Sequence, residues 1–178
     1  ASLSGYDCVF HLAANADVRF GIEYPRKDLE QNTLVTFNVL EAMRANSIKK
    51  IVFSSTGSIY GESQIIPTPE DCPMPIQTSL YAASKISCES MIQAYCEGFE
   101  FQSWIFRFVS VVGERYTHGH IIDFYSKLKK NPSKLQVLGN GHQQKSYIYI
   151  QDCILGMMMG VEKADNKVNI FNLGTEES

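Results

Sequence analysis

Three short apolar runs, separated by two helical patterns, constrain the fold of this chain more than any other feature. Residues 8–14, 50–55 and 103–109 are nearly continuous apolar segments, as expected of strands covered on both faces. Apolar residues recur at helical spacing over residues 25–45, and a second helix is expected over about residues 80–99. Alternating strands and helices with short links are typical of right-handed βαβ crossovers. The sequence therefore predicts an α/β fold built on a parallel sheet.

The chain after Gly113 has a different pattern. Its expected elements are a helix at about 118–130, a strand at 135–138, a turn at 139–141, a strand at 146–150, a helix capped by Asp152 that reaches about Lys163, and a last strand at 168–173. At the other end, a buried-type strand begins within the first eight residues, with no preceding element to pair with it. We therefore expect a sheet that is incomplete at its N-terminal side, as in a fragment of a longer protein.

Composition and charge argue against several classes of function. The 178 residues carry a formal net charge of -3, which offers no electrostatic attraction for nucleic acid or for an anionic membrane. Polar residues interrupt every apolar stretch before it could cross a bilayer, and the first residues lack a signal-peptide pattern. The five cysteines are odd in number and no two lie three apart, so we expect a reduced, cytoplasmic protein. His118 and His120 lack suitably spaced partners, and no metal site is expected.

Tyr81 and Lys85 are the strongest candidates for chemistry. Residues four apart on a helix share a face, so a phenol and an ammonium can approach one substrate from the same side. Tyr125 and Lys129 repeat this spacing, which alone does not choose between the two pairs. Thr56, however, precedes Tyr81 and follows a buried strand, and ligands of parallel sheets bind beyond the carboxyl ends of the strands. We therefore choose Tyr81, because Tyr125 lies in a Lys-rich, solvated helix.

A series of short motifs makes the sequence similar to a known family. The motifs are His11–Ala14, Asn32 and Thr36 ahead of Asn38–Ala42, Ser54–Thr56 followed by Ile59–Gly61, Tyr81–Lys85, Arg107–Gly113, and Tyr147–Asp152. Each motif is weak alone, but together they cover nearly the whole chain in order. The chain resembles the extended short-chain dehydrogenases/reductases, and within them the NAD-dependent nucleotide-sugar epimerase/dehydratase family, especially its UDP-glucose 4-epimerase-like members.

The resemblance implies a Rossmann-like, doubly wound parallel sheet, incomplete at the N-terminus, with part of a small C-terminal substrate-binding lobe. Residues 1–110 would form the C-terminal part of the NAD-binding domain. Residues 111–146 would begin the substrate-binding lobe, and residues 147–178 would return to the NAD-binding domain.

The same resemblance assigns roles to individual residues. Thr56, Tyr81 and Lys85 would be catalytic, with Thr56 holding the substrate oxygen and Lys85 also binding the nicotinamide ribose. Asn32 could line the cofactor or only brace the strand ends. The residues implied to contact NAD are Leu12, Ala13, Ala14, Asn15, Asn32, Ser54, Tyr81, Lys85 and Val109. The residues implied to contact the nucleotide sugar, a UDP-hexose, are Thr56, Ser110 and Lys145.

The chemistry of these groups indicates how they would act. A free phenol has a pKa of about 10 and is a poor base at neutral pH. A neighbouring ammonium and the positive nicotinamide would favour the phenolate and lower that pKa. Tyr81 could then take the proton of a sugar hydroxyl while hydride leaves the same carbon for the nicotinamide.

The residues after Thr56 bear on which reaction follows the oxidation. Dehydratases and decarboxylases of the family resemble each other in placing an acidic residue there, because a second acid–base group must remove the proton next to the new ketone. Here Gly57, Ser58 and Ile59 follow, and none can serve. An epimerase needs no such group, so we expect 4-epimerisation of a UDP-hexose such as glucose/galactose. A 4,6-dehydratase or reductase of the same family, and an inert nucleotide-binding fragment, remain as alternatives.

Three departures from the family pattern concern binding. Ser110 stands where the family commonly has Asn. Lys145, or Gln144 under a shifted alignment, replaces a phosphate-binding Arg, and Lys keeps the charge but loses the bidentate fork. No glycine-rich turn opening a helix precedes Cys8, and such a turn normally holds the cofactor pyrophosphate.

The remaining expectations concern pairing and packing. Family members usually pair through two helices, here placed at about residues 27–45 and 80–98. Exposed apolar residues on them, such as Met91 and Ile92, would support a homodimer, but a partly buried core face would look the same in sequence. Three further residues have structural interpretations: Arg107 is expected to pair with a carboxylate, His11 to be a satisfied core residue, and Tyr60 to pack.

Overall fold

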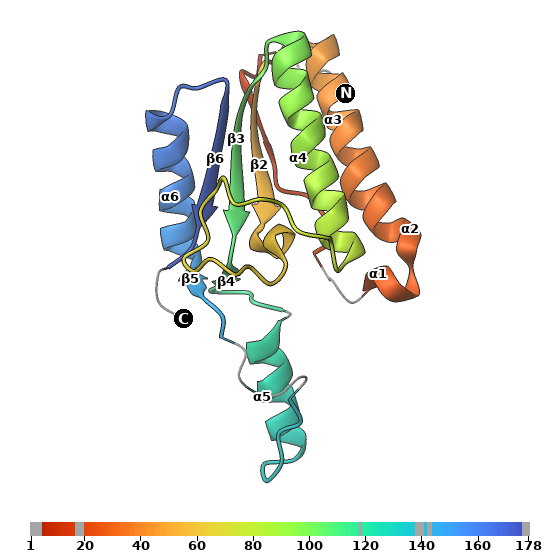
Figure 1. Cartoon of the computed structure of the whole chain (residues 1–178), viewed down its shortest axis with the longest axis vertical. Coiled ribbons are helices and arrows are strands. Elements are labelled where there is room, and N and C mark those ends of the chain that lie inside the picture. Colours follow the sequence, from red (N-terminus) through yellow and green to blue (C-terminus); the bar gives the residue numbers. More distant parts are fainter. Residues whose placement is uncertain (1–4, 17–19, 118, 138–140, 142–143, 176–178) are drawn as a thin grey trace.

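A four-stranded parallel sheet forms the centre of the molecule. The computed structural model describes residues 5–16, 20–117, 119–137, 141 and 144–175. The strands are β1 (Cys8–His11), β2 (Lys50–Thr56), β3 (Gln102–Phe108) and β6 (Val168–Leu173), in the order β1-β2-β3-β6 with every neighbouring pair parallel. Helices α3 (Val35–Ala45) and α4 (Leu80–Phe99) cover one face, and α6 (Ile150–Lys163) covers the other (Figure 1). The predicted α/β, Rossmann-like fold is confirmed.

The helical segment predicted over residues 25–45 is helical throughout but not uniform. The short helices α1 (Phe20–Glu23) and α2 (Pro25–Asp28) come first, and a π-helical segment, Leu29–Leu34, then joins α2 to α3. Such widened turns often occur at functional sites. Here the π-helical segment carries Asn32, whose buried side chain hydrogen-bonds to other elements of the fold.

The helix ends follow from local capping. Helix α4 has the predicted bounds, and its N-cap Ser79 accepts a hydrogen bond from the backbone N of Ala82 at 3.1 Å. Helix α6, in contrast, begins at Ile150 with Tyr149 as its N-cap, so the prediction that Asp152 caps it was wrong. Asp152 lies in the first turn instead, where a carboxylate interacts favourably with the helix dipole.

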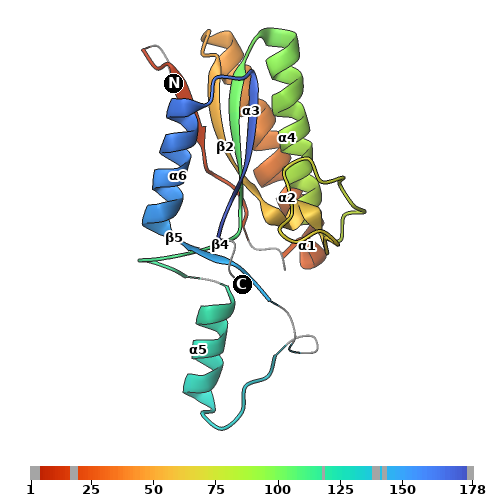
Figure 2. The ribbon, with the colours of Figure 1, turned by 60° about the vertical axis from the view of Figure 1, so that its left-hand side comes forward.

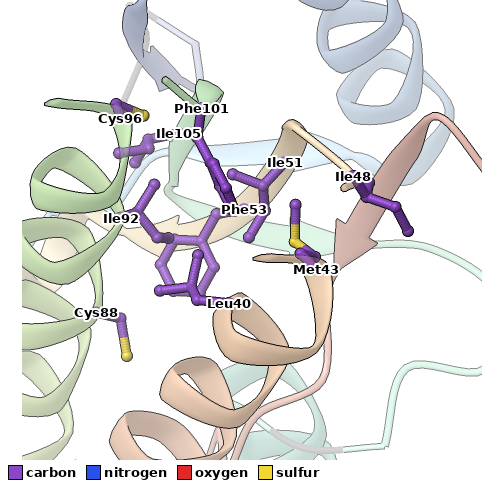
Figure 3. Close-up of a cluster of buried hydrophobic side chains, with 10 residues drawn as sticks. All are labelled: Leu40, Met43, Ile48, Ile51, Phe53, Cys88, Ile92, Cys96, Phe101 and Ile105. Atoms are coloured by element: carbon purple, nitrogen blue, oxygen red, sulfur yellow. The ribbon is translucent and has the colours of Figure 1, made fainter. Parts of the chain in front are cut away.

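Two hydrophobic clusters lie on opposite faces of the sheet. Successive side chains of β2 point to opposite faces, so Ile51 and Phe53 join one cluster and Val52 joins the other. The cluster toward α3 and α4 contains Leu40, Met43, Ile48, Ile51, Phe53, Cys88, Ile92, Cys96, Phe101 and Ile105 (Figure 3). The cluster toward α6 contains Val52, Trp104, Phe106, Ile148, Cys153 and Met157.

Ile92, which would support pairing if it were exposed, is part of the core. It is fully buried, and Met91 packs partly buried against the same cluster, because this side of α4 faces the sheet. The exposed apolar side chains of α3 and α4 are instead Phe37, Leu80 and Phe99. Pairing of two copies through these helices stays a prediction.

A smaller unit lies beyond the carboxyl ends of the strands. Strand β4 (Ser110–Val112) pairs in parallel with β5 (Tyr147–Tyr149), and helix α5 (His120–Lys130) projects away from the main sheet (Figure 2). The strand predicted at 135–138 is absent over 135–137, where the carbonyl of Gln136 accepts from Lys127 Nζ instead of a neighbouring strand. Leu138 and most of the predicted turn at 139–141 lie outside the described residues. None of the helices in the described part of the chain combines the length and hydrophobicity needed to span a membrane.

Candidate active site

The carboxyl ends of three neighbouring strands bring most of the predicted site residues to one edge of the sheet. His11 pairs in register with Phe53, and Thr56 pairs with Phe108, so β1, β2 and β3 end near one another. The predicted segments that follow these ends are residues 12–15, 54–56 and 109–110. Helix α4 adds Tyr81 and Lys85 from its first two turns.

Tyr81 and Thr56 are in direct contact. Their side chains are hydrogen-bonded, and both residues are buried, with Tyr81 9% exposed. Thr56 is oriented by its own turn, because its Oγ1 accepts from the backbone N of Ser58 at 3.1 Å. Burial raises the pKa of the Tyr81 phenol, the Thr56 hydrogen bond opposes this, and the charge of Asp28 adds to the rise in pKa.

Lys85 is held by the strand beside it. Its Nζ donates to the carbonyl of Ser54 at 2.7 Å and lies 4.5 Å from the centre of the Phe53 ring, so the ammonium contacts β2. Lys85 is 3% exposed, and burial lowers its pKa to about 8, with the charges of Cys88 and Glu89 opposing. Ser54, predicted to contact the cofactor, thus positions the ammonium through its backbone.

The buried Lys85 is expected to make protein stability depend on pH. Its pKa is about 8 in the folded state against an ordinary value of 10.5, so between these values the unfolded chain binds more protons and the free energy of unfolding rises with pH. In urea unfolding of the cofactor-free, full-length protein, the stability of wild type relative to Lys85→Met should increase by about 3 kcal/mol across this pH range. Lys129→Met, on the exposed surface of α5, is the control. A relative stability that stays constant or falls with rising pH would contradict this assignment.

The segment after β1 contains exposed residues and a buried residue held by hydrogen bonds. Leu12 is 53% exposed and Ala13 and Ala14 are also exposed, so small or accessible apolar side chains line this strand end. Asn15 is buried, and its backbone N donates to Asn32 Oδ1 at 2.8 Å. The predicted cofactor residues Asn15 and Asn32 therefore use their polar groups to hold the segment in place.

Val109 and Ser110 continue the same edge, and Lys145 lies in the segment that leads into β5, where the carbonyl of Ser146 accepts from the backbone N of Ser110 at 3.4 Å. The backbone N of Val109 donates to the carbonyl of Leu173 at 3.3 Å, and Ser110 begins β4. Lys145 lies two residues before β5, and its charge lowers the pKa of His120 after the larger effect of burial. Burial lowers the pKa of Lys145 itself. Within the described residues, no hydrogen bond joins Lys145 to Thr56, Tyr81 or Lys85.

A buried polar network behind Thr56 was only partly predicted. Arg107 pairs with Glu89 at 2.8 Å, both side chains being 3% exposed, which confirms the expected carboxylate partner. Ser55 also donates to Glu89. Tyr60 does more than pack, because its hydroxyl accepts from Arg107 and donates to Asn172. The signal for this network was an Arg inside an apolar strand, but nothing in the sequence marked Glu89 or Asn172 as its partners.

The same network fixes the loop that connects Thr56 to Tyr81, drawn in yellow in Figure 1. Arg107 donates to the carbonyl of Glu70 at 2.8 Å. The side chain of Asn172 donates to the carbonyl of Thr68 at 2.7 Å, and its backbone N donates to Glu70 Oε1 at 2.8 Å. His11, predicted as a satisfied core residue, is 4% exposed and hydrogen-bonded to Thr36 at 2.9 Å.

The residues at this edge fit one half of a dinucleotide. Leu12, Ala13 and Ala14 give an open apolar surface suited to a ring, and Lys85 supplies an ammonium donor suited to ribose hydroxyls. A glycine-rich turn for the pyrophosphate does not occur in the sequence. The described residues thus account for the nicotinamide side of such a cofactor.

Comparisons with known proteins agree with this geometry. The model of a family described as the NAD dependent epimerase/dehydratase family matches residues 1–174. The UDP-glucose 4-epimerase of Corynebacterium glutamicum is 31% identical, over 98% of this chain and 57% of that protein. A crystal structure of UDP-galactose 4-epimerase superposes with a TM-score of 0.85 at 36% identity, over 95% of this chain and 56% of that one. The UDP-glucuronic acid 4-epimerase from Bacillus cereus, solved with UDP-glucuronic acid and NAD, also gives a TM-score of 0.85, at 31% identity over 96% and 55%. The chain therefore spans about half the length of the relatives that it matches.

Proposed function

Because the chain belongs to the NAD-dependent epimerase/dehydratase family, we propose that its protein is a nucleotide-sugar 4-epimerase acting on a UDP-hexose of the glucose/galactose type. The observation that carries this proposal is the contact between Tyr81 and Thr56 at the carboxyl end of β2, with Lys85 one turn further along α4. The matching relatives named above, which act on UDP-glucose, UDP-galactose and UDP-glucuronic acid, support the choice of substrate class.

The proposed reaction assigns one task to each residue. Thr56 would hold the sugar hydroxyl, and Tyr81 would take its proton and later return it. When bound, NAD would supply the hydride acceptor and a positive charge beside the phenol. Lys85, held by Ser54, would bind the ribose. Leu12, Ala13, Ala14 and Val109 would line the nicotinamide side, while Ser110 and Lys145 would contact the nucleotide sugar.

The segment after Thr56 supports epimerisation over dehydration. Thr56 Oγ1 donates to Ser58 Oγ at 3.1 Å, and Ile59 is fully buried, so this turn is occupied by its own contacts. Gly57, Ser58 and Ile59 offer no carboxyl group to remove the proton next to a ketone. An epimerase requires only that the oxidised sugar turn over and take hydride back on its other face.

The test uses the protein in its full length. It is incubated with NAD and either UDP-glucose or UDP-galactose, and interconversion is followed by chromatography. Formation of the other sugar nucleotide in both directions is the expected result. A 4-keto-6-deoxy product would replace the epimerase proposal by a dehydratase. Absence of any product together with absence of NAD binding would show that the protein is non-catalytic.

A further inference from the structure

Asp28 is a buried carboxylate close to the reactive pair that the proposed reaction does not use. It ends helix α2 and is 1% exposed. A carboxylate so deeply buried costs free energy unless partners compensate for the lost water. Within the described residues, none of the ion pairs involves Asp28. Its compensation comes from neutral amides instead.

Those amides join three separate elements of the fold. Asp28 Oδ1 accepts from Asn15 Nδ2 at 2.8 Å and from Asn32 Nδ2 at 3.4 Å. Asn32 Nδ2 also donates to Ser84 Oγ at 2.8 Å, and Ser84 Oγ donates to the carbonyl of Tyr81 at 2.7 Å. A continuous path of hydrogen bonds therefore runs from the segment after β1, through Asp28 and the π-helical segment, to the turn of α4 that carries Tyr81.

The second oxygen of Asp28 is left without a partner. Asp28 Oδ2 is one of two buried side-chain atoms in the described residues that lack a hydrogen bond. Gly21 covers it closely, because a Cβ added at Gly21 would lie 2.7 Å from Oδ2 and 3.2 Å from the Cβ of Leu80. The backbone of α1 thus closes this junction from one side.

The phenol of Tyr81 responds to this charge. Asp28 raises the pKa of Tyr81, in the same direction as burial and against the Thr56 hydrogen bond. Lys85 donates to the carbonyl of Ser54, and His11 is hydrogen-bonded to Thr36. Asp28 is the charged side chain that adds to the rise in the pKa of the phenol.

We propose that Asp28 is a positioning residue for the reaction of Tyr81: its carboxylate ties the segment after β1 to the catalytic turn of α4 and keeps that junction negatively charged. This inference rests on the proposed function and deepens it. Through this path Asp28 holds the turn that carries Tyr81 in place, and its charge adds to the rise in the pKa of the phenol, without touching substrate.

Two variants of the full-length protein distinguish the effect of the Asp28 charge from the effect of the hydrogen-bond path. Asp28→Asn removes the charge, and Ser84→Ala cuts the hydrogen-bond path to Tyr81 while leaving the charge. Ultraviolet difference titration of tyrosinate, with Tyr81→Phe subtracted, follows the Tyr81 phenol in the cofactor-free protein. We expect Asp28→Asn to shift this titration to lower pH, together with the acidic limb of the kcat/KM profile. Ser84→Ala should leave the titration unchanged and lower kcat by about tenfold to a hundredfold.

The control is Glu30→Gln, which removes an exposed carboxylate two residues further along and should change neither the titration nor kcat. An unshifted Tyr81 titration in a folded Asp28→Asn protein would overturn the proposal. Should Asp28→Asn fail to fold by circular dichroism, Ser84→Ala decides, since an undiminished kcat would also overturn it. The titration needs no substrate. It therefore still tests Asp28 if no UDP-hexose is converted, an outcome that would count against the proposed function alone.

Discussion

Tyr81→Phe is expected to lower kcat for interconversion of UDP-glucose and UDP-galactose by a factor of about 10²–10⁴, the range for loss of an acid–base group. The substitution removes only the hydroxyl that contacts Thr56 and keeps the ring in its buried position. Binding of the nucleotide sugar should therefore change little, so the loss appears in kcat more than in KM. Steady-state kinetics of the full-length protein with saturating NAD measure both quantities.

The matched control for this variant is Tyr125→Phe. Tyr125 and Lys129 have the same spacing as Tyr81 and Lys85, but Tyr125 lies on α5 and is 63% exposed. We expect Tyr125→Phe to retain wild-type kcat. Comparable losses in both variants, or a fully active Tyr81→Phe protein, would show that the helix position and the Thr56 contact do not define the catalytic tyrosine.

Arg107→Met should reduce the free energy of unfolding by about 3–5 kcal/mol. The reason is that the buried carboxylate of Glu89 would lose its cationic partner while remaining in the interior. Tyr60 and the carbonyl of Glu70 would lose a donor as well. Urea unfolding of the full-length protein at neutral pH gives this free-energy difference directly.

Two comparisons show whether the loss comes from the unpaired charge. Lys167→Met breaks the exposed pair between Lys167 and Glu97, 3.1 Å apart, and should cost at most about 1 kcal/mol. The double variant Arg107→Met/Glu89→Leu removes both charges and should recover part of the lost stability. If Arg107→Met costs no more than Lys167→Met, the buried pair does not stabilise the fold as described.

The sheet could be predicted from the sequence because buried parallel strands are apolar along their whole length. The runs at 50–55 and 103–109 became β2 and β3 within one residue at each end, and Val168–Leu173 matched β6. The helix expected over about residues 80–99 also matched α4. The strand expected at 135–138 failed because a short apolar run does not show whether a neighbouring strand is present to pair with it.

The candidate residues of the site could be named from the sequence, but the contacts that hold them in place could not. Tyr81, Thr56 and Lys85 could be chosen because spacing and strand ends place them together. The direction of the Lys85 ammonium depends on a rotamer and on the carbonyl of Ser54, which no periodicity encodes. Asp28 was missed for a related reason. Its partners come from separate elements, and an isolated Asp in a helical pattern is indistinguishable from a surface residue.

The anchoring of the loop between Thr56 and Tyr81 has a consequence for how proteins of this kind can diversify. Arg107 and Asn172 hold the loop at Thr68 and Glu70, whereas residues 64–67 are exposed. Insertions or exchanges within residues 64–67 would be absorbed before they reach the anchors. The reactive groups keep their spacing while the neighbouring surface varies. Sequence change in residues 64–67 can therefore accumulate without displacing Thr56 or Tyr81.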